Sequence, residues 1–135
     1  MRRHDDRGAV AVEFGLLLPV LMMVIWGIIE FGLAIHSTLV LTNAAREAAR
    51  TVAISGDPTK AAGAVTSVAD TEGAVSVNVY QRLTSASSPT ALSSGACTNG
   101  AMVSVLVSKP YTVVIPFVPN ISMTLSGKGA MRCGG

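Results

Sequence analysis

The first third of the chain has a hydrophobic pattern unlike that of the rest. No charged residue occurs between Phe14 and Ile29, and the apolar helical pattern runs from Ala9 to about Ile35. A helix needs about 20 mostly apolar residues to cross a bilayer. We therefore predict a transmembrane helix over about 9–35. Trp26 lies toward its far end, where aromatic side chains favour the membrane interface.

Basic residues precede this span and set its direction. Arg2, Arg3 and Arg7 are expected to hold the N-terminus in the cytoplasm, so that the rest of the chain is exported. A secretory signal peptide cut after Gly32-Leu33-Ala34 is a competing interpretation. Its apolar region should be only about 7–15 residues long, however, and here the helical pattern continues past that site. Pro19 lies inside the span and is expected to kink the helix.

Beyond the span the helical pattern becomes amphipathic, over 36–55. One side gathers small apolar residues and the other gathers polar ones. The apolar side holds Ala44, Ala45, Ala48 and Val52, and the polar side holds Asn43, Arg46, Glu47 and Arg50. Gly56, Asp57 and Pro58 then end the helix. A short second helix is expected from there to about Glu72, with Ala61, Ala62, Val65, Val68 and Ala69 facing inward.

In the C-terminal half the period changes to two, which predicts β-strands. Three segments alternate apolar with mostly polar residues, at 75–80, 103–108 and 121–126. A further strand is predicted at 111–115, at a sheet edge, because Pro110 and Pro116 bound it. Antiparallel meander connections fit the spacing, and a long loop is expected at 84–100. The predicted fold class is therefore α+β, a long N-terminal helix followed by a small, mostly antiparallel sheet.

Composition narrows the class of protein further. The 135 residues suffice for one small domain and an anchor. The formal net charge is only +2, aromatic residues make up 4% of the chain, and no basic patch is present. Nucleic-acid binding would need such a patch, usually with stacking aromatics, so no nucleic-acid partner is expected.

The chain has two cysteines, Cys97 at the end of the predicted loop and Cys133 after the last predicted strand. In an exported domain such a pair is expected to form a disulfide, which would tie the loop to the C-terminus. In a reducing compartment both would remain free thiols.

No catalytic or metal-binding pattern is recognisable. His4 precedes the span and His36 lies near its outer end, so the two cannot share a site within one subunit. The chain has no Cys-x-x-Cys pair, no phosphate-binding glycine loop and no nucleophile elbow. We expect no enzymatic activity, no cofactor, no metal and no small-molecule substrate.

The residues at the inner edge of the predicted span form the most informative motif of the chain. Gly8 is followed by four apolar residues and then by Glu13 and Phe14. An ionisable residue in an apolar helix is costly and usually has a specific partner. Glu13 could simply mark the inner interface of an ordinary anchor, with Gly8 as a flexible joint. If the chain is instead cut after Gly8, the new amine of Ala9 lies one turn before Glu13 on the same helix face. The amine of a neighbouring subunit could then pair with the carboxylate and set the register of packed helices.

This pattern resembles the processing site of type IV pilins, and more narrowly the TadE-like pseudopilins of the tight-adherence (Flp) pilus system. The resemblance is carried by the leader 1–8, the run 7–21 with its Pro19, the segment 29–32 and the Ala/Arg-rich helix 43–50. It is weaker beyond about Asp57. It implies three parts: a prepilin-type leader over 1–8, an N-terminal helix over 9–56 and an exported α+β domain over 57–135.

The resemblance also implies a function. A prepilin peptidase would cut between Gly8 and Ala9, with Glu13 as the assembly carboxylate and Phe14 as the aromatic residue of the motif. Further expected partners are other pilins or pseudopilins, the inner-membrane assembly platform and the lipid bilayer. The expected location is the cytoplasmic membrane, with the C-terminal domain outside, or the pilus at the cell surface.

Because the chain carries a globular domain that the very short major Flp pilin lacks, a structural role as a minor pilin or pseudopilin is expected. An uncleaved single-pass anchor that displays a small binding or adhesion domain is the alternative, and its mature chain would start at Met1. A domain released by signal peptidase would start near Ile35.

Overall fold

The computed structural model describes residues 5–69, 75–83, 85, 87–116 and 119–134. Two helices precede four strands, which confirms the expected α+β fold. The elements are α1 (Asp5–Ser55), α2 (Lys60–Val68), β1 (Ser76–Arg82), β2 (Thr90–Ala91), β3 (Met102–Val113) and β4 (Ile121–Arg132). All strand pairs are antiparallel, in the order β2-β1-β3-β4.

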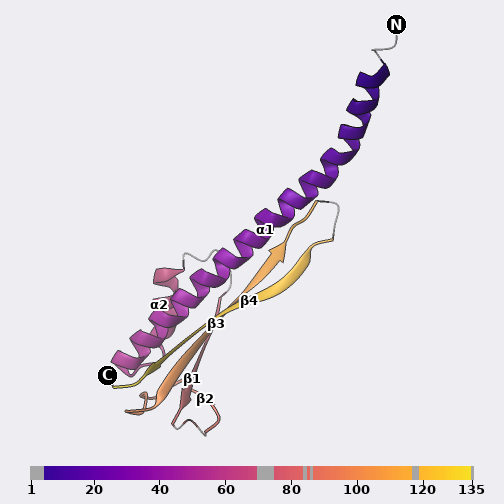
Figure 1. Ribbon diagram of the computed structural model, residues 1–135. Coiled ribbons are helices and arrows are strands. Elements are labelled where there is room, and N and C mark those ends of the chain that lie inside the picture. The colour runs from indigo at the N-terminus through magenta and orange to yellow at the C-terminus, as the bar shows by residue number, and fades with distance from the viewer. Residues whose placement is uncertain (1–4, 70–74, 84, 86, 117–118, 135) are drawn as a thin grey trace.

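Helix α1 is one continuous element of 51 residues, about 77 Å long at 1.5 Å per residue. Its C-terminal half lies along the sheet, and its N-terminal part projects beyond every other element (Figure 1). Pro19 lies inside the helix without ending it. The helix curves in this projecting part (Figure 1).

The sheet is uneven in length. β1 pairs with β3 only as far as Ser76 and Ser108. β3 and β4 remain paired beyond this point, up to Val113 and Ile121. The two strands therefore continue together as a two-stranded projection, which we call the hairpin arm (residues 110–116 and 119–126). Figure 1 shows the arm running beside the middle of α1.

The arm corrects one expectation about the strands. The segment 111–115 is not a separate strand, because β3 continues through Pro110 to Val113. β3 has only β4 as a neighbour at this point, so the missing N–H of Pro110 is tolerated on the open edge. The expectation of an edge position was therefore right, and the expectation of a break at Pro110 was wrong.

The core is aliphatic and built from small residues. Buried residues come from α1 (Leu41, Ala44, Ala45, Ala48, Ala49, Val52, Ala53), α2 (Ala61, Val65) and β3 (Val103, Val105, Val107). The small side chains on α1 let β4 approach closely. A Cβ atom added at Gly127 would lie 2.6 Å from the carbonyl oxygen of Leu41, so the strand rests directly on the helix backbone.

The second helix is shorter than predicted. It ends at Val68, and residues 70–74 of the predicted stretch lie outside the described part of the chain. Ala61, Val65 and Ala69 are buried as expected, whereas Ala62 and Val68 are exposed. A helix of only nine residues presents a narrow buried face, which these three positions already fill.

Candidate functional site: the exposed part of the N-terminal helix

The predicted cleavage position lies on an open helical surface. Gly8 and Ala9 are exposed in the first turns of α1, and a Cβ atom added at Gly8 would meet nothing within 4 Å. Helix α1 begins at Asp5, so the bond between Gly8 and Ala9 is helical. The predicted leader 1–8 thus lies partly within α1, and residues 1–4 lie outside the described part.

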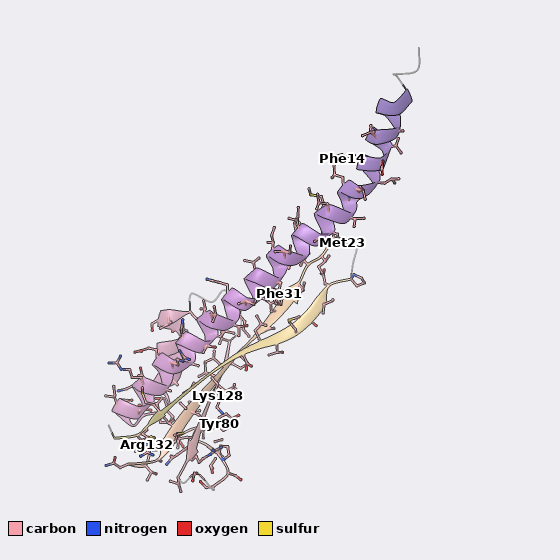
Figure 2. The ribbon with its side chains drawn as sticks, viewed as in Figure 1. Phe14, Met23, Phe31, Tyr80, Lys128 and Arg132 are labelled. Atoms are coloured by element: carbon pink, nitrogen blue, oxygen red, sulfur yellow. A yellow bond between two sulfur atoms is a disulfide. The ribbon has the colours of Figure 1, made fainter. Side chains whose placement is uncertain are left out.

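Glu13 and Phe14 lie on the same free stretch of helix. Both side chains are exposed, Phe14 to 62%, and Figure 2 shows Phe14 on the part of α1 that projects beyond the sheet. Glu13 lies one turn after Ala9 on one helix face. Where side chains are described, Glu13 has no hydrogen bond or ion pair within the subunit. Among the side chains that the structure describes, none is placed to pair with this carboxylate.

The free stretch has a sharp outer limit. Every residue from Gly8 to Trp26 is exposed, and we call these 19 residues the uncovered segment. From Gly27 onward one face of the helix is covered. Half-buried residues recur there at helical spacing (Gly27, Glu30, Ala34, Ser37, Thr38), and they lead into the buried face that starts at Leu41.

The uncovered segment is apolar enough to span a membrane. The helix from Gly8 onward contains a window of 18 residues with mean hydropathy 2.3, and none of that window is buried in the subunit. It is the one candidate span among the described residues. By its length and composition this helix fits a single-pass membrane protein.

Two long-range hydrogen bonds attach the hairpin arm to α1 at the end of the uncovered segment. The indole Nε1–H of Trp26 donates to the carbonyl oxygen of Val114 at 2.7 Å. The Tyr111 hydroxyl donates to Oε2 of Glu30 at 3.1 Å. Desolvation first, and then the hydrogen bond to Glu30 and its charge, raise the pKa of the Tyr111 phenol.

Local sequence patterns do not predict these attachments. They indicate Trp26 as a residue of the membrane interface and 111–115 as an edge strand, without connecting the two. One signal was available, since no charged residue occurs between Lys109 and Lys128. Such an uncharged stretch is unusual for a domain that is otherwise rich in polar residues.

An apolar groove lies beneath the end of the arm. It measures about 540 Å³ and is lined by Pro19, Val20, Met22, Met23, Ile25 and Trp26 from α1 and by Pro116 from the arm. A second depression of about 330 Å³ lies between α2, β1 and the residues around β2. Among the described residues, no group of three or more His, Cys, Asp or Glu side chains is placed to hold a metal ion.

The two cysteines form a disulfide that fastens the far end of the domain, with their Cα atoms 6.0 Å apart. The backbone N–H of Cys97 donates to the carbonyl of Gly56 just after α1, and that of Cys133 donates to Ala101. The bridge therefore joins the end of α1, the long loop and the end of β4. It lies at the opposite end of the domain from the uncovered segment and takes no part in the candidate site.

Comparison with known proteins adds a family. Residues 8–50 match the family model described as TadE-like protein. No curated protein and no solved structure shows significant similarity to the chain. The matched stretch contains the complete uncovered segment and most of the small-residue face on which the sheet rests. Over these residues the chain is therefore similar to the TadE-like proteins, and the similarity is confined to α1.

Proposed function

We propose that this protein is a minor pilin or pseudopilin that a prepilin peptidase cuts between Gly8 and Ala9, and that takes part in assembling a tight-adherence pilus or a related secretion machine. The observation that carries the proposal is the TadE-like match over a helix whose first 19 matched residues are all exposed and, apart from Glu13, uncharged. In this proposal the protein is structural, with no catalytic site and no cofactor.

The mechanism follows from the position of Glu13. Before assembly the uncovered segment lies in the cytoplasmic membrane, with Arg2, Arg3 and Arg7 on the inner side. Cleavage creates an ammonium group on Ala9. A carboxylate in lipid is costly without a cation, so Glu13 favours packing beside the Ala9 ammonium of a neighbouring pilin. Such a pair sets the axial register between helices more than it adds stability.

The exported domain explains why a minor role is proposed. A fibre built mainly of short helical hairpins has little room for an additional four-stranded sheet on every subunit. A subunit carrying such a domain suits a fibre end, or a complex with the assembly platform in the membrane. Its partners are then the peptidase, other pilins and that platform.

The N-terminus of the mature protein tests the proposal. We would extract the protein from membranes of its native host and determine its intact mass and N-terminal sequence. A start at Ala9 is expected, and Gly8→Leu is expected to abolish the cut. A matched control is Gly15→Leu, at another exposed glycine of the same helix. A start at Met1 in cells with active peptidase would contradict the proposal and favour an uncleaved anchor that displays a binding domain, whereas a start near Ile35 would indicate release by signal peptidase.

A further inference from the structure

We propose that the end of the hairpin arm lies in the outer surface of the bilayer, with lipid acyl chains filling the groove beneath it, so that the protein holds the membrane with two elements. The inference rests on the proposed membrane topology but not on processing or on pilus assembly. The occupant to which it commits is lipid of the outer leaflet.

The length of the uncovered segment is the first support. Its 19 residues measure about 28 Å along the helix. The hydrocarbon core of a typical bilayer is about 30 Å thick. The arm therefore begins to cover α1 at the depth where the hydrocarbon ends. The predicted span of about 9–35 then shortens to Gly8–Trp26, and residues 27–35 belong to the outer interface.

The contacts at that depth suit an interface. Trp26 and Tyr111 are the residue types that concentrate at membrane surfaces, since each has an apolar ring and one polar group. Trp26 donates to Val114 at the end of the arm, and Tyr111 donates to Glu30 one helical turn farther out. A carboxylate at this level remains close to water, whereas four residues deeper it would lie in hydrocarbon.

The surface of the arm is the second support. The arm carries no charged residue, and Val114, Ile121 and Met123 are 43–50% exposed. In water such a patch next to an apolar helix would be unfavourable. It is continuous with the uncovered segment through the groove shared by Met23, Trp26 and Pro116. Figure 2 shows Met23 on α1 close to the end of the arm.

The backbone of the arm limits how deep it can enter. An irregular loop exposed to lipid does not occur within the hydrocarbon, because its N–H and C=O groups would lack partners. Strand pairing satisfies these groups up to Val113 and Ile121. Beyond that pair, Pro116 and Pro119 have no N–H, and the carbonyl of Val114 accepts from Trp26. The arm is thus suited to the boundary between headgroups and acyl chains.

The test places a fluorescent residue on the arm of the full chain. Trp26 is the only tryptophan, so Val114→Trp in a Trp26→Phe background reports the arm alone. The matched control is Ile54→Trp in the same background, at a 68% exposed position near the far end of α1. Both chains are reconstituted into vesicles of phosphatidylethanolamine and phosphatidylglycerol with brominated acyl chains, and alkaline carbonate extraction scores insertion separately.

We expect bromolipid to quench the arm tryptophan several-fold more strongly than the control, and aqueous acrylamide to quench it less. An inserted chain whose arm tryptophan is quenched by acrylamide alone overturns the inference. Protection from both quenchers also overturns it, because protein then covers the arm. A chain that does not insert contradicts the proposed topology as well. Trp26→Phe removes the hydrogen bond to the carbonyl of Val114. The comparison is therefore repeated in chains that keep Trp26. The fluorescence of the unchanged chain is subtracted there, which leaves the signal of the added tryptophan.

Discussion

Two glycines on β4 determine how closely the sheet approaches the helix. Gly127 and Gly129 are buried two positions apart on one strand face. A Cβ atom at Gly129 would lie 2.5 Å from the carbonyl carbon of Ala45, which is backbone and cannot rotate away. A glycine inside a strand normally weakens it, so its presence here reflects the close approach of another backbone.

Replacing Gly129 with alanine should therefore separate β4 from α1. For Gly129→Ala we expect a loss of about 1–3 kcal/mol in the free energy of unfolding, the usual cost of overpacking a core. The full chain is unfolded in detergent by heat or by denaturant, and unfolding is monitored through the circular dichroism of the sheet. The matched control is Gly63→Ala in α2, where an added Cβ meets nothing within 4 Å. That variant should be neutral or slightly more stable, and equal stability of the two variants would contradict the argument.

Asp57 fixes the turn between the two helices. Its Oδ1 accepts from the backbone N–H of Thr59 at 2.9 Å and from the Thr59 hydroxyl at 2.7 Å. These bonds, the hydroxyl bond first, lower the pKa of the Asp57 carboxyl below 3.8. A carboxyl whose pKa is lower in the folded state stabilises the fold above its unfolded pKa, and this contribution is lost as pH falls through the folded pKa.

For Asp57→Ala we expect a small decrease in melting temperature at neutral pH. The difference from the unchanged chain should shrink as the pH falls below 3.8 and through the lower pKa of the folded state, because Asp57 then becomes protonated in both states. Melting curves of both chains across this pH range check the expectation. A difference that stays constant with pH would show that the carboxylate charge has no role in the turn.

At the scale of elements, local periodicity accounts for what could be predicted. The spacing of Ala44, Ala48 and Val52 predicted the buried face of α1, and the alternation at 103–108 predicted β3, because both patterns depend on near neighbours. The extension of β4 through Gly127 and Gly129 was missed, since glycine carries no side-chain periodicity. The arm was missed because Trp26 and Val114 are 88 residues apart, and no local pattern reports such a contact.

The disulfide acts on the elements around the end of α1. It closes a loop with a sequence separation of 36, for which the chain-entropy model gives about 3–4 kcal/mol. The double variant Cys97→Ser, Cys133→Ser should lower the melting temperature of the domain strongly. The unchanged chain in dithiothreitol should behave in the same way. Thermal unfolding measures both, and a melting temperature unaffected by reduction would show that noncovalent contacts alone hold the loop and the C-terminus.

Tyr111 ties the arm to α1, so its hydroxyl should control how often the arm detaches. In Tyr111→Phe the hydrogen bond to Glu30 is lost, at a cost of about 1–2 kcal/mol. We expect faster amide hydrogen exchange in residues 121–126 and unchanged exchange around Val103 and Val105. Tyr80→Phe, at a half-buried position on β1, is the matched control. Uniformly faster exchange across the whole sheet would instead indicate global destabilisation.

At the scale of the whole molecule, the structure separates two kinds of surface along one helix. The C-terminal half of α1 packs against its own domain through small residues, whereas every residue of the uncovered segment is exposed and none belongs to the core. Substitutions in the uncovered segment should therefore leave the domain folded and change only what the protein does in the membrane or with its partners. This separation lets a defect in assembly be distinguished from a defect in folding.

Glu13 offers the sharpest use of that separation. Glu13→Ala removes a charge from an apolar helix, so membrane insertion should be as efficient as before or better. If Glu13 pairs with the Ala9 ammonium of another pilin, the variant should fail to crosslink with partner pilins and pilus assembly should fall. The matched control is Glu47→Ala, which removes a carboxylate of α1 that lies 4.0 Å from Arg50, in the part of the helix that packs on the sheet. Carbonate extraction, melting temperature and pilus yield are measured for both variants. Normal pilus yield with Glu13→Ala would contradict the pairing, whereas a loss in both variants would mean that assembly is sensitive to α1 in general and not to the carboxylate at position 13.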